Sequence, residues 1–136
     1  MKFGSSIIPC LRYRNAAVAI DWLCETFGLE RKLVVADDWG EIPHAQLTLG
    51  GGMVMVASAG DSEYDRLMNL PEEVGGAGTQ SIYVVVDDAD EIYKRARAAG
   101  AKIAIEIQDE DYGGRGFSCY DLEGHLWNFG TFDPWE

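Results

Sequence analysis

Short stretches in which every second residue is apolar alternate along this chain with two longer stretches in which apolar residues recur every three or four positions. The first pattern is typical of half-buried β-strands and the second of amphipathic α-helices. A residue that can cap a helix precedes each longer stretch, and a glycine ends it. We therefore predict helices over residues 16–27, between Asn15 and Gly28, and over residues 89–99, between Asp88 and Gly100.

The alternating stretches predict eight strands, four in each half of the chain. Two sequences between strands favour hairpins, namely the glycines at 50–52 and Asp-Leu-Glu-Gly at 121–124. Asp starts such a turn through bonds to nearby backbone, and Gly adopts a positive φ at little cost. Each half therefore has the order β-α-β-β-β. The predicted strands are residues 5–13, 29–36, 43–49, 53–58, 81–86, 102–107, 117–120 and 126–132.

The two halves form an internal repeat. The helix caps Asn15 and Asp88 are 73 positions apart (88 − 15), and the hairpin glycines Gly51 and Gly124 are separated by the same interval (124 − 51). Equal spacing at several points indicates a duplicated unit. We predict a single domain, residues 1–136, made of a first module at 5–58, a linker at 59–79 with one short helix within 61–70, and a second module at 80–132.

This order of elements predicts an α+β fold. Each module is expected to form a small, curved mixed sheet with its helix on the convex face, which leaves the concave face available. Two such sheets placed side by side curl around a common hollow. Small-molecule sites in proteins are concave and mostly apolar with a few polar groups. We therefore expect a ligand cavity between the concave faces.

Charge and composition exclude several classes of partner. A formal net charge of −12 argues against nucleic acid, because phosphates require clustered Lys and Arg. No apolar run approaches the roughly 20 residues that a membrane helix needs, and residues 1–6 are too polar for an export signal. Three cysteines at unrelated spacings fit a reducing compartment better than a disulfide framework. We predict a cytoplasmic protein.

Four sequences in the second half resemble those of a known superfamily. They are Val-Val-Asp-Asp-Ala-Asp at 85–90, Ala-Ala-Gly-Ala-Lys at 98–102, Tyr-Gly-Gly-Arg at 112–115 and Asp-Leu-Glu-Gly-His-Leu-Trp-Asn-Phe-Gly-Thr-Phe at 121–132. With the tandem βαβββ order, they are similar to the vicinal oxygen chelate superfamily of glyoxalases, bleomycin-resistance proteins and extradiol dioxygenases, and to its metal-poor, glyoxalase-like branch. The resemblance implies a half-open barrel with the helices outside. It also implies a homodimer that completes its cavity at the interface or by exchanging halves.

The resemblance also implies where a metal would bind. Family enzymes hold one divalent ion with a residue on the first and last strand of each half, and these positions fall on Ile8, Met55, Ser81 and Asn128. Divalent ions prefer His, Glu or Gln donors there, whereas all four residues are neutral and Ile8 offers no donor. We therefore expect no cofactor. A weak site that uses His44 and Gln46 with a carboxylate is the alternative, and His125 is expected to face outward.

Without a metal, the strand residues that alternation points toward the concave faces predict a cavity with both apolar and polar walls. Aromatic and Met side chains give flat or adaptable contacts, and Arg, Gln and Asn orient polar groups. Trp39 and the loop before Arg115 are expected at the rim, while Cys10 is expected as an inert, buried thiol. The candidate ligand-binding residues are Arg12, Trp39, His44, Gln46, Met55, Tyr83, Arg115 and Asn128.

Three functions fit these residues. The first is a metal-independent binding protein of the bleomycin-resistance type, which holds a small aromatic or cationic compound. The second is a metal-dependent glyoxalase-like lyase or dioxygenase. The third is a metal-free isomerase-like enzyme that uses Tyr83, His44 or Arg12 for acid–base chemistry. The acidic composition and the aromatic cavity favour the first.

Overall fold

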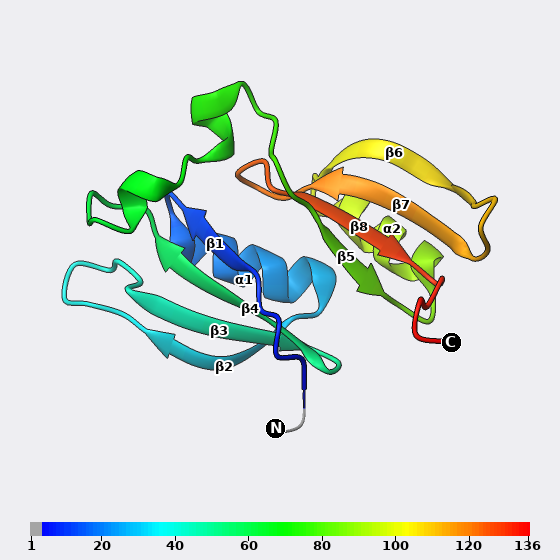
Figure 1. Ribbon diagram of the computed structural model, residues 1–136, viewed down its shortest axis with the longest axis horizontal. Coiled ribbons are helices and arrows are strands. Elements are labelled where there is room, and N and C mark those ends of the chain that lie inside the picture. The colour runs from blue at the N-terminus through cyan, green and yellow to red at the C-terminus, as the bar shows by residue number, and fades with distance from the viewer. Residues whose placement is uncertain (1–3) are drawn as a thin grey trace.

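The computed structural model describes residues 4–136, in which the chain folds into two similar halves (Figure 1). The first three residues, part of the N-terminal stretch considered above, lie outside the described residues. The first half contains β1 (Cys10–Tyr13), α1 (Ala16–Phe27), β2 (Glu30–Val35), β3 (His44–Leu49) and β4 (Gly52–Ser58). The second contains β5 (Ile82–Val85), α2 (Ala89–Ala98), β6 (Lys102–Asp109), β7 (Arg115–Tyr120) and β8 (Leu126–Gly130).

Each half forms one four-stranded sheet with the same strand order. The orders are β1-β4-β3-β2 and β5-β8-β7-β6, in which the first and last strands of each half pair in parallel and the other neighbours are antiparallel. Cys10 pairs with Met55 in the first sheet and Tyr83 with Asn128 in the second. Both partners are shifted by the predicted 73 positions, so the predicted α+β fold of tandem βαβββ units is confirmed.

The helix ends follow from local sequence. Asn15 Oδ1 accepts a hydrogen bond from the Val18 amide at 3.3 Å, and Gly28 ends α1 with φ 80°, a conformation that side chains with a Cβ avoid. Asp88 caps α2 in the same way, accepting from the Glu91 amide at 3.1 Å. Both caps are those predicted from the sequence.

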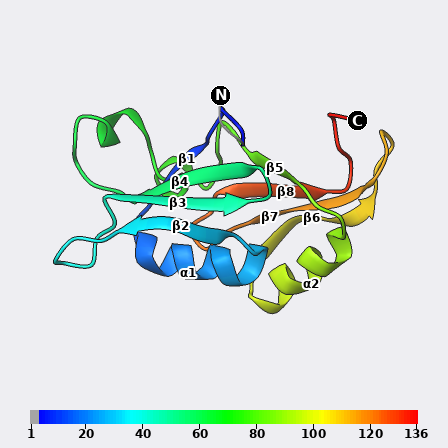
Figure 2. The same cartoon turned by 90° about the horizontal axis from the view of Figure 1, so that it is seen from below.

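The helices lie on one side of the sheets and the other side is uncovered (Figure 2). Alternate residues of the strands point to the helices, where they form a core shared by both halves. Phe27 of α1 contacts Trp127 and Phe129 of β8, with ring centroids 5.2 and 4.6 Å apart, and α1 packs on α2. The two halves are therefore joined through their convex sides, while both concave faces point away from the shared core. The predicted cavity between the two concave faces is therefore wrong for a single chain, because the cavity on the second sheet is lined by residues of the second half alone.

The connection between the halves departs from the prediction. In place of one short helix within 61–70, the structure has two 3₁₀ turns, η1 (Asp65–Leu67) and η2 (Pro71–Val74). Pro71 stands at the start of η2, where its missing N–H is not needed. The predicted first strand is also shorter, because β1 begins only after Pro9. The helices within residues 4–136 are all too short or too polar to cross a bilayer.

Candidate ligand-binding site

The concave side of the second sheet contains a cavity of about 290 Å³. Three of the predicted site residues line it, namely Tyr83, Arg115 and Asn128. We call it the second-sheet cavity. The residues that complete its lining are Ile105, Gln108, Glu110, Tyr112, Gly113, Gly116, Phe117, Ser118, Phe129, Gly130 and Phe132.

Asn128 lies at the floor of this cavity with its amide fully engaged. Its Nδ2 donates to Ser81 Oγ at 3.0 Å and to the Ile82 carbonyl at 3.1 Å, and its Oδ1 accepts from Ser118 Oγ at 2.6 Å. These bonds follow from the register, because Ser118 pairs with Asn128 and β5 runs along the other side of β8. These three hydrogen bonds hold the amide in one orientation.

Tyr83 lies against the backbone of β8. A Cβ added at Gly130 would stand 2.5 Å from Tyr83 Oη and 3.1 Å from its Cε1, so the absence of a side chain at Gly130 makes room for the phenol. The hydroxyl donates to the Phe132 carbonyl at 2.7 Å, and 41% of the residue remains exposed. Partial burial, followed by the nearby Tyr112, Asp133 and Glu110, raises the pKa of Tyr83. The phenol is therefore protonated at neutral pH and can contact a ligand through its ring.

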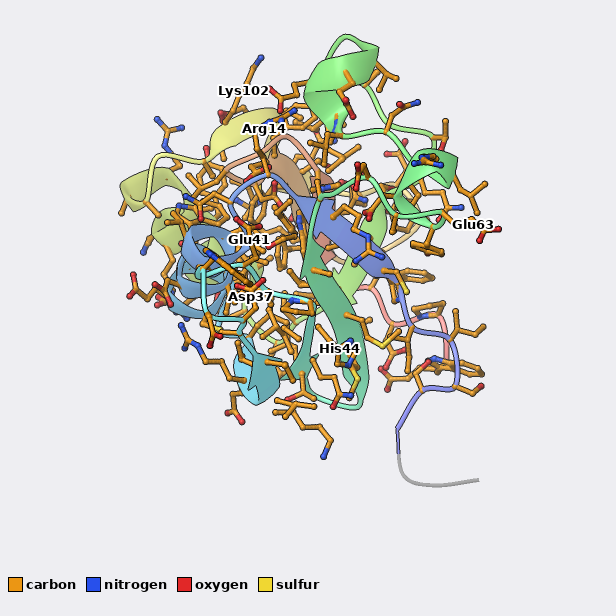
Figure 3. The ribbon with its side chains drawn as sticks, turned by 90° about the vertical axis from the view of Figure 1, so that its left-hand side faces the viewer. Arg14, Asp37, Glu41, His44, Glu63 and Lys102 are labelled. Carbon is orange, nitrogen blue, oxygen red and sulfur yellow. The ribbon has the colours of Figure 1, made fainter. Side chains whose placement is uncertain are left out.

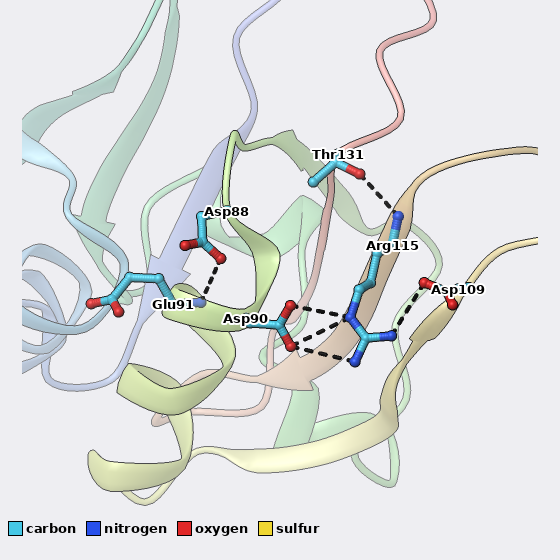
Figure 4. Close-up of polar contacts among 6 residues, drawn as sticks. All are labelled: Asp88, Asp90, Glu91, Asp109, Arg115 and Thr131. Atoms are coloured by element: carbon cyan, nitrogen blue, oxygen red, sulfur yellow. Dashed lines mark hydrogen bonds and ion pairs between the residues drawn. The ribbon is translucent and has the colours of Figure 1, made fainter.

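The guanidinium of Arg115 is held by two carboxylates (Figure 4). Its Nε lies 3.1 Å from Asp90 Oδ2 at the start of α2, and its Nη1 lies 3.2 Å from Asp109 Oδ1 at the end of β6. These partners raise the pKa of Arg115, Asp90 more than Asp109. Arg115 lines the cavity, as the sequence predicts. Its positive charge is already balanced by Asp90 and Asp109.

Arg12 lies in a different hollow. A second cavity, of about 320 Å³, opens between the end of β1 and the connection after β4, and Arg12 lines it together with Asp65. Arg12 Nε stands 3.3 Å from Asp65 Oδ1, and the guanidinium lies 4.8 Å from the centre of the Tyr64 ring. This ion pair ties the connection to the first sheet, and it separates Arg12 from the other predicted site residues.

The remaining predicted residues belong to the first sheet. Gln46 pairs with Met55 on the neighbouring strand, so both side chains lie on the concave face. The Gln46 amide nitrogen is 3.0 Å from His44 Nε2, which places these two polar groups together as expected. Neither cavity described above includes any of these three residues.

Trp39 stands at the tip of the turn between β2 and β3. Asp37 Oδ1 accepts from the amides of Trp39 and Glu41, and Figure 3 shows Asp37 and Glu41 close together at this turn. Trp39 is 84% exposed and lines neither of the two cavities described above. The structure therefore does not place Trp39 at the rim of either cavity.

Two sequence expectations are wrong. His125 was expected to face outward, but its Nε2 lies 2.8 Å from the Arg12 carbonyl and its ring packs edge-on against Tyr13. His125 shares its row with the buried Trp127 and Phe129, and at the start of β8 this row meets the first half of the chain. Cys10 was expected to be buried, but it is exposed, because the concave face of the first sheet is uncovered.

The family model that describes the Glyoxalase/Bleomycin resistance protein/Dioxygenase superfamily matches residues 7–129. This chain belongs to that superfamily. The match begins before β1 and ends in β8, so it covers nearly all of both βαβββ units.

Relatives within the superfamily align along nearly the whole chain. TioX from Micromonospora sp. ML1 is 36% identical, with a TM-score of 0.70 over 93% of this chain and 98% of TioX. An uncharacterised protein of Mycobacterium tuberculosis H37Rv is 29% identical over 125 residues, which are 92% of this chain and 73% of that protein. The fosfomycin resistance protein FosX from Listeria monocytogenes shares the fold at 18% identity, with a TM-score of 0.66 over 98% of this chain and 94% of FosX.

The superfamily's metal positions do not fit a divalent ion in this member. Asn128 and Ser81 bond to each other and to neighbouring groups, whereas Met55 and Ile8 belong to the other half. Among residues 4–136 no three His, Cys, Asp or Glu side chains are grouped so that they could hold a metal. The four side chains are neutral and Ile8 has no donor atom, so these positions lack the charged donors that such an ion needs.

Sequence reasoning missed several residues of the second-sheet cavity. Glu110 lines it from the loop after β6, where alternation gives no facing direction, and Phe132 lines it from beyond the end of β8, although the predicted strand 126–132 includes this residue. Gly114 is the residue in the sequence that could have indicated this part of the cavity. A Cβ there would stand 2.7 Å from the Phe132 amide nitrogen, so this glycine lets the β6–β7 loop approach the segment after β8.

Proposed function

We propose that this superfamily member binds a small organic molecule, aromatic or cationic, on its concave surface and without a metal ion. The second-sheet cavity is the observation that carries the proposal. It combines aromatic and aliphatic walls with a few oriented polar groups, chiefly Asn128 and Ser118, which is the composition of small-molecule sites. The neutral residues at the four metal positions support a role that needs no ion.

We also propose that the working form is a homodimer. Large apolar side chains remain open on the concave faces of both sheets, including Leu33 and Val35 of β2 and Ile105 of β6. Exposed apolar patches of this kind mark binding surfaces. The two halves of one chain are joined through their helices, so a second copy is the natural source of a cover for each concave face. The exposed side chain of Trp39 would then contact the second copy.

Filling the cavity tests the binding proposal. Ile105 lines the cavity and is 54% exposed, so Ile105→Trp fills the hollow without disturbing the core. We expect calorimetric titration with a panel of small aromatic and cationic compounds to find at least one ligand, whose affinity falls at least about tenfold in this variant. Val74→Trp, at an equally open position on η2, is the control and should bind as the unmodified protein does.

Two results would contradict the proposal. One is a panel in which no compound binds. The other is a ligand whose affinity is lowered equally by Ile105→Trp and Val74→Trp, since only the first position lines the cavity. The homodimer is tested separately by sedimentation equilibrium, which should give about twice the mass of 15.0 kDa for one chain.

A further inference from the structure

Three aromatic side chains from three separate segments converge on the second-sheet cavity. Tyr83 comes from β5, Tyr112 from the β6–β7 loop and Phe132 from the segment after β8. The rings of Tyr112 and Phe132 meet edge to face with centroids 5.1 Å apart, and the Tyr83 hydroxyl donates to the Phe132 carbonyl. All three are at least partly exposed, so they form walls of the cavity and not part of the core.

Backbone contacts hold this aromatic cluster together. The Arg115 amide donates to Thr131 Oγ1 at 2.9 Å, and the Thr131 amide donates to the Arg115 carbonyl at 3.0 Å. The loop is closed by a bond from the Glu110 amide to the Gly114 carbonyl at 2.9 Å. Tyr112 and Phe132 are therefore positioned by the fold before any ligand arrives.

Acidic groups outnumber basic groups at the same cavity. Glu110 and Arg115 are the charged residues of its lining within residues 4–136, and Arg115 is already paired with Asp90 and Asp109. The Glu110 side chain, in contrast, forms no hydrogen bond or ion pair with the described residues. Asp111 and Asp133 stand next in sequence to Tyr112 and Phe132. The lining therefore contains one carboxylate without a partner among the described residues, beside an arginine whose charge two aspartates already balance.

We infer that the second-sheet cavity selects an organic cation, namely an ammonium or quaternary ammonium group held against Tyr83, Tyr112 and Phe132 and paired with Glu110. The inference rests on the proposed function and names the ligand class of that site. The negative faces of aromatic rings attract cations, and a carboxylate beside them adds to the attraction. An anion would be repelled by Glu110, and a neutral ligand would leave the charge of Glu110 without a partner.

The test compares choline with 3,3-dimethylbutan-1-ol, which has the same shape with carbon in place of the ammonium nitrogen. Nuclear magnetic resonance titration of the ¹⁵N-labelled protein follows the amides of Gly113, Gly116 and Gly130, which line the cavity. We expect both compounds to shift these signals, with an affinity for choline about tenfold higher than for the alcohol. Equal affinities would overturn the inference and leave the binding proposal in place.

Two variants assign the preference to named side chains. Glu110→Gln and Tyr112→Leu should each lower the affinity for choline several-fold, with little effect on the alcohol. Both side chains are free to change, because Tyr112 is exposed and Glu110 makes no side-chain hydrogen bond in the described structure. Glu63→Gln removes the same charge from an exposed position elsewhere (Figure 3) and should leave both affinities unchanged.

The outcomes separate the two proposals. If choline binds equally well to the unmodified protein, Glu110→Gln and Tyr112→Leu, the cation is not held at these residues and the inference fails. If neither choline nor the alcohol shifts the three glycine amides, the inference fails. The wider binding proposal fails only when the rest of the panel also leaves the cavity signals unmoved.

Discussion

Tyr13 in β1 and Asp121 in the β7–β8 turn are joined by a hydrogen bond of 2.5 Å, although 108 positions separate them in the sequence. Asp121 Oδ2 also accepts from the Trp127 indole at 3.0 Å, and its Oδ1 accepts from the amides of Glu123 and His125. Four donors thus satisfy one carboxylate that is almost completely buried. This group fixes the turn of the second half against the first strand of the chain.

The same turn also reaches the start of α1. The two carboxylate oxygens of Glu123 accept hydrogen bonds from the amides of Arg14 and Asn15, at 2.6 and 2.8 Å. These amides precede the helix and have no partner within it. The contacts of Asp121 and Glu123 together make the docking of the two halves specific, which the shared apolar core alone would not.

Replacement of Tyr13 by Phe tests this contact. The change removes one donor from a buried carboxylate while it keeps the ring and its packing, so we expect a loss of about 1.5–3 kcal/mol in the free energy of unfolding. Urea denaturation followed by tryptophan fluorescence measures it. Tyr64→Phe is the control, because the Tyr64 hydroxyl makes no hydrogen bond with residues 4–136. Equal stability of the two variants would show that the contact contributes nothing.

Stability should also fall at alkaline pH. Burial, followed by the charge and hydrogen bond of Asp121, raises the pKa of Tyr13 well above its ordinary value. The unfolded chain releases this proton near pH 10, while the folded protein keeps it. The unfolded state therefore binds fewer protons above that pH, and the free energy of unfolding decreases as pH rises.

The thiol of Cys119 acts in the same direction. Burial, followed by the charge of Asp121, raises the pKa of this thiol to about 12. The folded protein therefore loses the stability that this thiol contributes as pH rises above about 9. Chemical denaturation at a series of pH values between 7 and about 11 measures the total effect. We expect a shallower decline in Tyr13→Phe than in the unmodified protein, and an identical slope would argue against the contribution of Tyr13.

The fold was predictable from sequence because its signals are local and occur twice. Caps at Asn15 and Asp88 and hairpin glycines at Gly51 and Gly124 share one interval, and the strand registers repeat it. The nearness of Ser81 and Asn128 followed instead from the family resemblance, which assigns both residues to one metal site, and in the structure a hydrogen bond joins them. Periodicity and spacing are sufficient for properties that depend on neighbours within one module.

The docking of the two halves was not predictable in this way. Strand phase correctly separates His125 from Asn128, but it cannot show that the first half covers the face on which His125 lies. Arg12 was grouped with the other inward residues, yet the connection after β4 folds over it and Asp65 forms an ion pair with it. Such contacts depend on irregular segments, and hydrophobic periodicity does not predict the path of these segments.

The neutral metal positions lead to a prediction for the purified protein. Because Ile8, Met55, Ser81 and Asn128 supply no charged donor, protein prepared without added metal should contain far less than one equivalent of Zn, Ni, Mn or Fe. Elemental analysis measures this content, and incubation with a chelator should leave ligand affinity and thermal stability unchanged. Stoichiometric metal, together with an activity abolished by the chelator, would favour the metal-dependent lyase or dioxygenase instead.

Gly130 offers the sharpest test of the cavity itself. Ala at this position would place its Cβ 2.5 Å from Tyr83 Oη, so the phenol must move and lose its hydrogen bond to the Phe132 carbonyl. Because Tyr83 is a wall of the cavity, we expect Gly130→Ala to weaken ligand binding about tenfold or more. Gly51→Ala is a matched control, since a Cβ there meets no atom within 4 Å and the backbone φ is ordinary. Calorimetry with the best ligand of the panel compares the two variants. A ligand that binds Gly130→Ala as tightly as Gly51→Ala would show that the position of Tyr83 does not shape the site.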